Sequence, residues 1–407
     1  MTPSTPRIFY AAGPGHIIGT YEHWRAGRDD PSQVARTYSG EFFDACKAMG
    51  AAGYAMSYHP DKRVLKDGEF RIEHRPIPFI RGPGPLFHLA YFWSGIGMTW
   101  SAWRWGANVA IVSAGAHWFS LSLMPMLGIK VVPSLLCTLW LKHRPPSGLK
   151  KLIMKLDARF FRRRTAAILS MSNDCTEQVN QLTGGYPAPL IAFLPTYRRE
   201  SFTGIGPPPT NGPFRVLSAG RIETNKGVYD LLAIAERFAR MGRTDIEFDL
   251  CGKGSQLDRL RERAKAAGVA DRFRCHGHQS RDQMREMFNK CHVLIAPTTS
   301  DFIEGFNQTV AEGVLAGRPV ITSDACPALA YVKPAVLDVP VDDVTAYGDA
   351  ILRLADDKAL YEAKRNSCST VSEMFYDRSA GFTSAICQAV PTVLGKPLTA
   401  RPEKSPE

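Results

Sequence analysis

Short apolar runs alternate with longer segments in which apolar residues recur every three or four positions, along both halves of the chain. The short runs have the length of strands, and the periodic segments that of amphipathic helices. Predicted strands are residues 8–12, 53–57, 109–113, 129–135, 167–171, 214–220 and 246–251, and predicted helices are residues 40–49, a segment from residue 173 and residues 228–238. Strands that alternate with helices build parallel sheets covered by helices on both faces. The pattern therefore predicts an α/β chain with doubly wound sheets.

The length of the chain and one proline cluster predict two domains joined by a linker. With 407 residues, 44% of them hydrophobic, the chain can bury two cores of ordinary domain size. The triplet Pro207-Pro208-Pro209, with glycines near it, predicts a linker at residues 201–212. We expect an amino-terminal domain at residues 1–200 and a carboxyl-terminal domain at residues 213–375. Residues 392–407 are poor in apolar residues and are predicted to be disordered.

A strand, a glycine turn and a helix follow one another at the start of the carboxyl-terminal half. The apolar run ends at Gly220, Arg221 comes next, and Asn225-Lys226-Gly227 precedes the periodic helix. This order suits phosphate groups, because a helix start offers free N–H groups. Arg221 can donate a fork of hydrogen bonds and Lys226 adds a second positive charge, so together they can offset much of a diphosphate's charge without a metal. The alternative is that both are ordinary surface cations at a helix start.

A second glycine turn weighs against that alternative. Gly252 and Gly254 follow the strand at residues 246–251, and residues 297–300 end a further strand. Since the carboxyl ends of parallel strands meet at one edge of a sheet, three strand ends converge on the crevice where open α/β sheets bind ligands.

The segment EGFNQTVAE, residues 304–312, places two carboxylates around the start of a predicted helix. A helix that begins near Asn307 exposes backbone N–H groups and the positive end of its dipole, which suit a phosphate beside Glu304. Glu312 falls about one and a half turns into the helix, where a carboxylate can accept hydrogen bonds from a nucleotide ribose. Two glutamates with this spacing also occur on solvated helix faces.

These residues resemble the retaining family 4 glycosyltransferases of the GT-B fold. The similarity covers most of the carboxyl-terminal half and rests on four segments together: AGRIETNKG, FDLCGKG, FRCHGH and EGFNQTVAEGVLAGRPVITSD. It implies that Arg221 and Lys226 contact the diphosphate of a nucleotide sugar, and that Glu304 binds the sugar hydroxyls. The donor-binding residues that it implies are Gly220, Gly252, Gly254, His278, Gly305, Phe306, Asn307, Gln308 and Glu312, with backbone amides acting at Phe306 and Asn307 and a ribose contact at Glu312.

The same resemblance implies two Rossmann-like domains that face each other across a cleft, with a helix at residues 376–391 packing back on the amino-terminal domain. The implied activity is retaining transfer of a sugar from a nucleoside diphosphate sugar to an acceptor hydroxyl, without a metal or other cofactor. The expected acceptor is a glycan or a lipid-linked sugar, in bacterial-type polysaccharide or glycolipid assembly. A catalytically inactive nucleotide-sugar-binding subunit is the alternative function, and a soluble sugar phosphate is an alternative acceptor.

Two positions depart from the pattern of similar enzymes. Asn307 stands where many relatives carry glycine, so its side chain is expected to reshape the sugar pocket. A histidine that follows a strand of the amino-terminal domain in similar enzymes is replaced here by Leu136. The nearest substitutes are His117, to which we assign the catalytic role, and His16; a lone histidine at a strand end is also often structural.

The loop Gly13-Pro14-Gly15 follows the first predicted strand. A dinucleotide-binding dehydrogenase needs a third glycine where Ile18 stands, and an acidic residue where Tyr58-His59-Pro60 stands. We therefore interpret Gly13, Gly15 and His16 as lining the acceptor side of the cleft, with a plain tight turn as the alternative.

The net charge is +11, and basic residues cluster at residues 142–164, where nine lysines and arginines accompany one acid, Asp157. Apolar residues recur between them, which predicts a basic amphipathic helix after Pro145-Pro146. Such a helix can lie on an anionic membrane near a lipid-linked acceptor, or it can pack its apolar stripe on its own domain. No nucleic-acid recognition motif accompanies it, so nucleic acid is not an expected partner.

Residues 86–102 are aromatic-rich and nearly uncharged, and are predicted to form a buried helix because they are at the short end of a bilayer span. Nine cysteines without regular spacing and no secretory leader favour a cytoplasmic enzyme, peripheral on the inner face of a membrane where the basic helix binds lipid. A zinc site is the alternative suggested by Cys275, His276, His278, Cys291 and His292. Because the chain has neither Cys-x-x-Cys nor Asp-x-Asp, no metal is expected.

Overall fold

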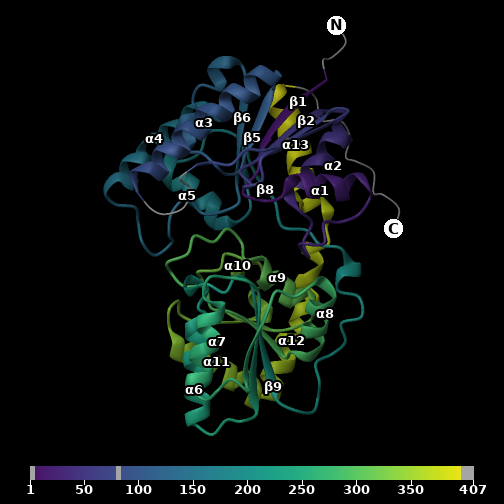
Figure 1. Cartoon of the computed structure of the whole chain (residues 1–407), viewed down its shortest axis with the longest axis vertical. Coiled ribbons are helices and arrows are strands. Elements are labelled where there is room, and N and C mark those ends of the chain that lie inside the picture. The colour runs from purple at the N-terminus through teal and green to yellow at the C-terminus, as the bar shows by residue number, and fades with distance from the viewer. Residues whose placement is uncertain (1–4, 79–83, 396–407) are drawn as a thin grey trace.

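The computed structural model describes residues 5–78 and 84–395, which form two α/β domains stacked end to end (Figure 1). The amino-terminal domain holds an eight-stranded sheet of order β3-β4-β2-β1-β5-β6-β7-β8. Neighbouring strands are parallel except for β3 and β4, which pair antiparallel at one edge. The strands are β1 (Arg7–Ala11), β2 (Ala52–Ser57), β3 (Arg63–Asp67), β4 (Phe70–His74), β5 (Val109–Val112), β6 (Lys130–Leu135), β7 (Ile168–Ser170) and β8 (Leu190–Ala192).

Helices cover both faces of this sheet. They are α1 (Ile17–Arg25), α2 (Tyr38–Met49), α3 (Pro85–Trp105), α4 (Gly148–Arg164) and α5 (Asn173–Thr183), with the 3-10 helices η1 (Trp118–Leu121), η2 (Pro125–Leu127) and η3 (Arg199–Ser201). Successive strand residues point to opposite faces. In β1, Ile8 and Tyr10 therefore belong to the core under α1 and α2, whereas Phe9 and Ala11 belong to the core under α3 and α4. The predicted doubly wound α/β fold is confirmed.

The carboxyl-terminal domain holds a six-stranded sheet of order β11-β10-β9-β12-β13-β14, parallel throughout. Its strands are β9 (Phe214–Ala219), β10 (Ile246–Cys251), β11 (Phe273–Gly277), β12 (Val293–Ala296), β13 (Val320–Thr322) and β14 (Val336–Asp338). Its helices are α6 (Val228–Arg240), α7 (Leu257–Ala266), α8 (Arg281–Lys290), α9 (Gln308–Leu315), α10 (Leu329–Val332), α11 (Val344–Asp356) and α12 (Lys358–Ser372), with η4 (Thr224–Lys226), η5 (Lys333–Ala335), η6 (Glu373–Phe375) and η7 (Arg378–Ala380).

The last helix, α13 (Phe382–Leu394), returns to the amino-terminal domain and lies along α2 (Figure 1). Thr383 donates a hydrogen bond to the carbonyl of Glu41 at 3.1 Å, and the Phe382 ring lies 4.9 Å from that of Phe193. The helix begins six residues after its predicted start, because the chain first makes the turns η6 and η7. It also passes through Pro391, so residues 392–394, predicted to be disordered, are helical. Buried Ala389 and Val390 hold this last turn against the domain, and the rest of the predicted tail, residues 396–407, lies outside the described residues.

Helix α3 is not the buried helix that its composition predicts. Its sheet side buries Gly95, Met98, Thr99 and Ala102, whereas Trp93 and Trp100 are 61% and 59% exposed on the other side. The prediction was wrong because a helix that is apolar on every side meets the sheet along only one stripe. Of the helices in the described residues, none has the length and apolarity needed to span a bilayer.

The carboxyl ends of the two sheets face each other. The loop after β6 meets the loop that leads into α9: a Cβ added to Gly305 would lie 1.9 Å from the carbonyl oxygen of Leu136. Aromatic rings extend the contact, since Phe375 lies 5.9 Å from Phe306 and 6.3 Å from Tyr197. The strand-end residues of both domains therefore border one interdomain region.

Candidate functional site

Three strand ends of the carboxyl-terminal domain are packed together by glycines. A Cβ on Gly252 would lie 1.6 Å from the Gly220 carbonyl oxygen, and one on Gly254 would lie 2.1 Å from that of Ile222. The backbone of Gly252 also donates a hydrogen bond to the carbonyl of Gly277, at the end of β11, at 2.8 Å. Any side chain at these glycines would push the turns apart. The third strand end of the sequence prediction, residues 297–300, meets the same region, because the Thr299 N–H donates to the Asn225 carbonyl at 3.2 Å. His278 follows Gly277 and is exposed at this edge.

Lys226 and Glu304 form an ion pair at this edge, and their side chains are only 18% and 15% exposed. The ammonium of Lys226 lies 3.9 Å from the centre of the Phe302 ring, and the guanidinium of exposed Arg221 lies 5.1 Å from the same ring. The structure thus brings together the two cations and the first glutamate of the sequence prediction. Phe302 was not predicted, because nothing in its local sequence marks an aromatic ring as the platform for two cations.

Helix α9 begins directly after Glu304, Gly305 and Phe306. Its N-cap residue, Asn307, has φ of 72°, in the left-handed region that glycine and asparagine tolerate best. The Asn307 amide donates to Thr298 Oγ1 at 3.3 Å and Cys326 Sγ at 3.1 Å. The side chain is thereby held by the strand ends behind the loop, which explains how asparagine replaces glycine here. The Val310 N–H donates to the Asn307 carbonyl at 3.2 Å, but among the described residues no side chain caps the first turn of α9, so the N–H groups of Gln308 and Thr309 are left for a ligand.

Glu312 lies one and a half turns further along α9. Burial raises the pKa of its carboxyl group to about 7. Gln308, on the first turn, reaches the amino-terminal domain: its Nε2 donates to Tyr38 at 3.4 Å, and its carbonyl accepts from the Tyr197 hydroxyl at 3.3 Å. Glu312 is partly exposed, and a carboxylate in such a partly desolvated place gains from hydroxyl donors, which is the chemistry that a ribose offers.

On the amino-terminal side, Leu136 and Cys137, which the sequence resemblance predicts to stand where similar enzymes carry histidine, directly follow β6. The carbonyl of Leu136 packs against Gly305, as described above. Cys137 is exposed at the surface, but desolvation by the surrounding protein, and after it the negative charge of Glu304, raise the pKa of its thiol, while Lys226 and Arg221 act to lower it. Cys137 therefore lies within the field of the charged cluster.

His117 lies under α3 and not beside that cluster. Its Nε2 is 3.1 Å from Nδ1 of His88, and its ring stacks on Phe119 at 5.6 Å. Burial, together with His88, lowers the pKa of His117 to about 4, so the ring is neutral at pH 7. The catalytic role assigned to His117 stays a prediction.

The predicted acceptor loop joins a group of three histidines that the sequence does not reveal. The ring of His16 lies 4.9 Å from that of His59 and 5.0 Å from that of His74. His16, Asp61 and His74 are the one group within the described residues whose ligand atoms are close enough to hold a metal ion. However, His74 Nε2 accepts from the Ile18 N–H at 3.2 Å and its Nδ1 faces the Asp61 carbonyl at 3.1 Å, so both its nitrogens are engaged by the backbone. The cluster therefore fixes the loop, whose Gly13 and Gly15 face open space.

Two of the three histidines of the zinc alternative, His276 and His292, are also engaged within the protein. His276 Nε2 lies 2.7 Å from an Asp249 carboxylate oxygen. His292 Nε2 lies 2.9 Å from the Pro209 carbonyl, and its Nδ1 accepts from the Arg215 N–H at 3.0 Å. These contacts give both side chains structural partners at the ends and edges of the sheet.

Residues 207–370 match the family model described as Glycosyl transferases group 1. The 2-deoxystreptamine N-acetyl-D-glucosaminyltransferase of Streptomyces fradiae is 26% identical over 325 residues, which cover 72% of this chain and 75% of that protein. HepE from Anabaena, solved in complex with UDP, is similar in structure with a TM-score of 0.64 and 11% identity, over 96% of this chain and 100% of HepE. The α,α-trehalose 6-phosphate synthase of Burkholderia multivorans gives a TM-score of 0.71 and 12% identity, over 96% of each chain. Residues 207–370 are thus similar to group 1 glycosyl transferases, and the chain as a whole shares the two-domain GT-B fold of these structures.

Proposed function

We propose that this protein is a retaining glycosyltransferase that transfers a sugar from a UDP sugar to an acceptor hydroxyl in polysaccharide or glycolipid assembly. The observation that carries the proposal is the Lys226–Glu304 ion pair beside the open first turn of α9. The Streptomyces relative is named for N-acetylglucosaminyl transfer, and HepE was solved with UDP, which supports a uridine nucleotide as donor.

We propose that the bound donor separates the Lys226–Glu304 ion pair, with its diphosphate contacting Lys226 and its sugar contacting Glu304. Its diphosphate takes Lys226, together with Arg221 and the leading N–H groups of α9, while the sugar hydroxyls take Glu304. The ribose hydroxyls donate to Glu312. When the donor binds, Lys226 and Glu304 each exchange the other for a group of the donor. Neither charge is then unpaired in a largely buried position.

In the proposed reaction the acceptor oxygen bonds to the anomeric carbon on the face from which the diphosphate leaves. The bond between that carbon and the diphosphate oxygen breaks, and the acceptor proton passes to the departing oxygen. Negative charge grows on the diphosphate as this happens. Lys226, Arg221 and the α9 amides would stabilise it by on the order of several kcal/mol, without a metal.

A nucleotide-sugar-binding subunit without transfer activity is favoured by one observation, the replacement of the expected histidine by Leu136 and Cys137. Both functions require donor binding, but only the transferase releases UDP faster when an acceptor is added. Release of UDP with and without acceptor therefore separates them.

Donor binding can be tested by thermal unfolding. We expect UDP sugars to raise the melting temperature more than GDP sugars, equally with and without EDTA, because the phosphate contacts proposed are all from the protein. At a ligand concentration of about 100 times Kd, the gain is roughly 2.7 kcal/mol. A chain whose melting temperature responds to no nucleoside diphosphate sugar would contradict the proposal.

The basic helix α4 divides into two parts. Asp157, Phe160 and Phe161 are buried against the domain, whereas Leu149 and Leu152, in its first half, are each 55% exposed. Exposed Lys150, Lys151 and Lys155 lie among these leucines. We propose that the first half of α4 lies on an anionic membrane and that the second half anchors the helix to the domain.

Replacement of Lys150 and Lys151 by alanine is expected to weaken sedimentation with phosphatidylglycerol vesicles by roughly 30-fold, at about 1 kcal/mol for each charge near the surface. Lys265→Ala, which removes a charge from exposed α7 in the other domain, is the matched control and should bind as the wild type does. If the double variant and the control bind the vesicles equally, α4 does not contact the membrane.

A further inference from the structure

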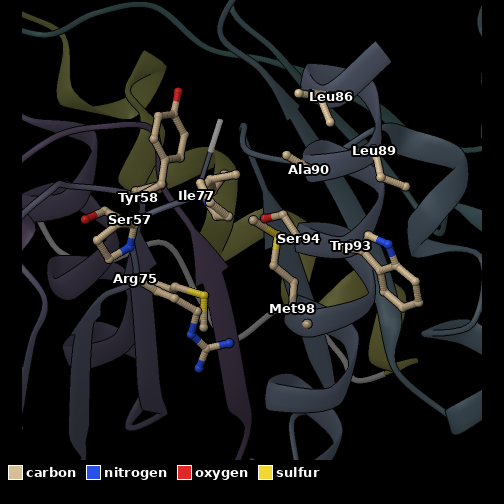
Figure 2. Close-up of a pocket in the computed structure, with 15 residues that line it drawn as sticks. Ser57, Tyr58, Arg75, Ile77, Leu86, Leu89, Ala90, Trp93, Ser94 and Met98 are labelled. Atoms are coloured by element: carbon tan, nitrogen blue, oxygen red, sulfur yellow. The ribbon is translucent and has the colours of Figure 1, made fainter. Parts of the chain in front are cut away.

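An apolar pocket of ≈ 360 Å³ lies between α3 and the ends of β1, β2 and β4. Figure 2 shows its two walls: Ser57, Tyr58, Arg75 and Ile77 on one side, and side chains of α3 from Leu86 to Met98 on the other. The floor is buried, with Met56, Ile77 and Met98 each less than a tenth exposed. Nothing in the donor site described above uses this pocket.

The charged residue in its wall is neutralised. Arg75 donates to a Glu73 carboxylate oxygen at 2.8 Å and 2.6 Å, and to the hydroxyl of Ser101 on α3 at 2.8 Å. These bonds tie the end of β4 to α3 and leave little free charge at the pocket. The pocket therefore suits an apolar ligand, and its volume is within the range of ordinary ligand sites.

The rim of the pocket is apolar and exposed. Leu86, Leu89 and Trp93 line the opening and are 60%, 53% and 61% exposed. Trp93 and Trp100 are seven residues apart, so the stripe continues along one face of α3. A stripe of exposed tryptophan and leucine is costly in water and typical of a surface that meets a membrane.

The helix that carries this stripe is linked through η1 to the second, anchored half of α4. The Phe92 ring of α3 stacks on Phe119 of η1 at 6.0 Å, and the Phe119 N–H donates to Asp157 of α4 at 2.9 Å. Met126 and Leu127 of η2, which follows η1 in the chain, are 67% and 44% exposed. Figure 1 shows α3 and α4 on the same flank of the domain, and side chains of both belong to the same core under one face of the sheet. Apolar side chains next to lysines and arginines match the hydrocarbon and the anionic headgroups of a lipid surface.

The inner end of the pocket reaches the acceptor side of the cleft. Ala12 and Tyr58 line the pocket, and the Tyr58 N–H donates to the carbonyl of Gly13, in the acceptor loop, at 3.4 Å. We propose that the pocket holds the hydrocarbon chain of a membrane lipid that carries the acceptor, with its polar head directed toward Gly13 and the interdomain cleft. This inference rests on the proposed glycosyltransferase function, for which it defines the acceptor as an amphiphile with a long chain.

Dodecyl phosphate below its micelle concentration is a suitable probe, with ethyl phosphate as the comparison that shares only the head. Ala90→Phe places an aromatic ring in the pocket wall, whereas Ile96→Phe makes a similar change on α3 outside the lining. We expect dodecyl phosphate to bind the wild type and Ile96→Phe alike, and Ala90→Phe at least tenfold more weakly. Ethyl phosphate should bind measurably to none of them.

Melting with UDP, measured on the same proteins, separates the two proposals. Unchanged stabilisation by UDP in Ala90→Phe, combined with equal dodecyl phosphate binding in all three proteins, would overturn the lipid pocket and leave donor binding intact. A wild-type protein whose melting temperature does not rise with UDP would instead contradict the proposed function. A dimer in sedimentation velocity that dissociates on Trp93→Ser would show that α3 meets a second copy of the chain, and would also overturn the inference.

Discussion

Lys226→Ala is expected to lower kcat by roughly 10²–10³-fold at saturating donor, the usual cost of removing one group that stabilises charge on a leaving group. Lys226 forms an ion pair with Glu304, and both side chains are largely buried. Negative charge grows on the diphosphate as it leaves. Loss of the positive charge of Lys226 therefore raises the energy of the transition state more than that of the bound donor. Initial rates of UDP release at saturating donor and acceptor measure the effect.

The same substitution also leaves Glu304 without its ion-pair partner, which would lower stability and confuse the result. Circular dichroism and the melting temperature of the variant are therefore needed, with Lys265→Ala as the matched control for loss of a surface charge. Lys226→Ala combined with Glu304→Gln removes the unpaired charge, and should restore stability without restoring turnover. Near-normal turnover in a folded Lys226→Ala protein would refute the role proposed for this lysine.

The elements that could be predicted from the sequence are those whose pattern is local. The strands at β1, β2, β5, β6 and β9 have continuous apolar runs because helices cover both faces of a parallel sheet. The hairpin of β3 and β4 was not predicted: β3 is mostly exposed and carries no apolar run. Short strands such as β8, three residues long, hold too few residues for periodicity to show.

The candidate site likewise contains residues that could be predicted from the local sequence and contacts that could not. Arg221, Lys226, Glu304 and Glu312 follow strand ends or begin helices, so their proximity follows from the order of elements along the chain. Contacts between segments distant in sequence could not be predicted. Phe302 beneath the two cations is one, and the three histidines that follow β1, follow β2 and end β4 are another. The exposed face of α3 was missed because composition does not say which side of an apolar helix the sheet will cover.

Gly305→Ala is expected to lower kcat/KM by roughly 10²-fold, because displacing reacting groups by about 1 Å can cost that much. In the structure, the added Cβ would lie 1.9 Å from the Leu136 carbonyl oxygen and 2.7 Å from Cε of Met171. A carbonyl oxygen in the backbone cannot rotate away as a side chain can, so the loops after β6 and before α9 must separate. Steady-state kinetics with acceptor, compared with UDP affinity from thermal shift, measure the effect.

The two measurements should respond differently. UDP affinity is expected to change little, because the groups proposed to hold the diphosphate and ribose belong to the carboxyl-terminal domain and alanine keeps the Gly305 amide. Transfer also needs the acceptor brought to the sugar by the amino-terminal domain, which the added methyl group holds away. Gly206→Ala is the control, since its added Cβ meets its nearest neighbour, Asn289, at an ordinary 4.0 Å. Normal kcat/KM in Gly305→Ala would mean that the contact between Leu136 and Gly305 is absent from the catalytic state, and that the domains react in a more open arrangement than the one described.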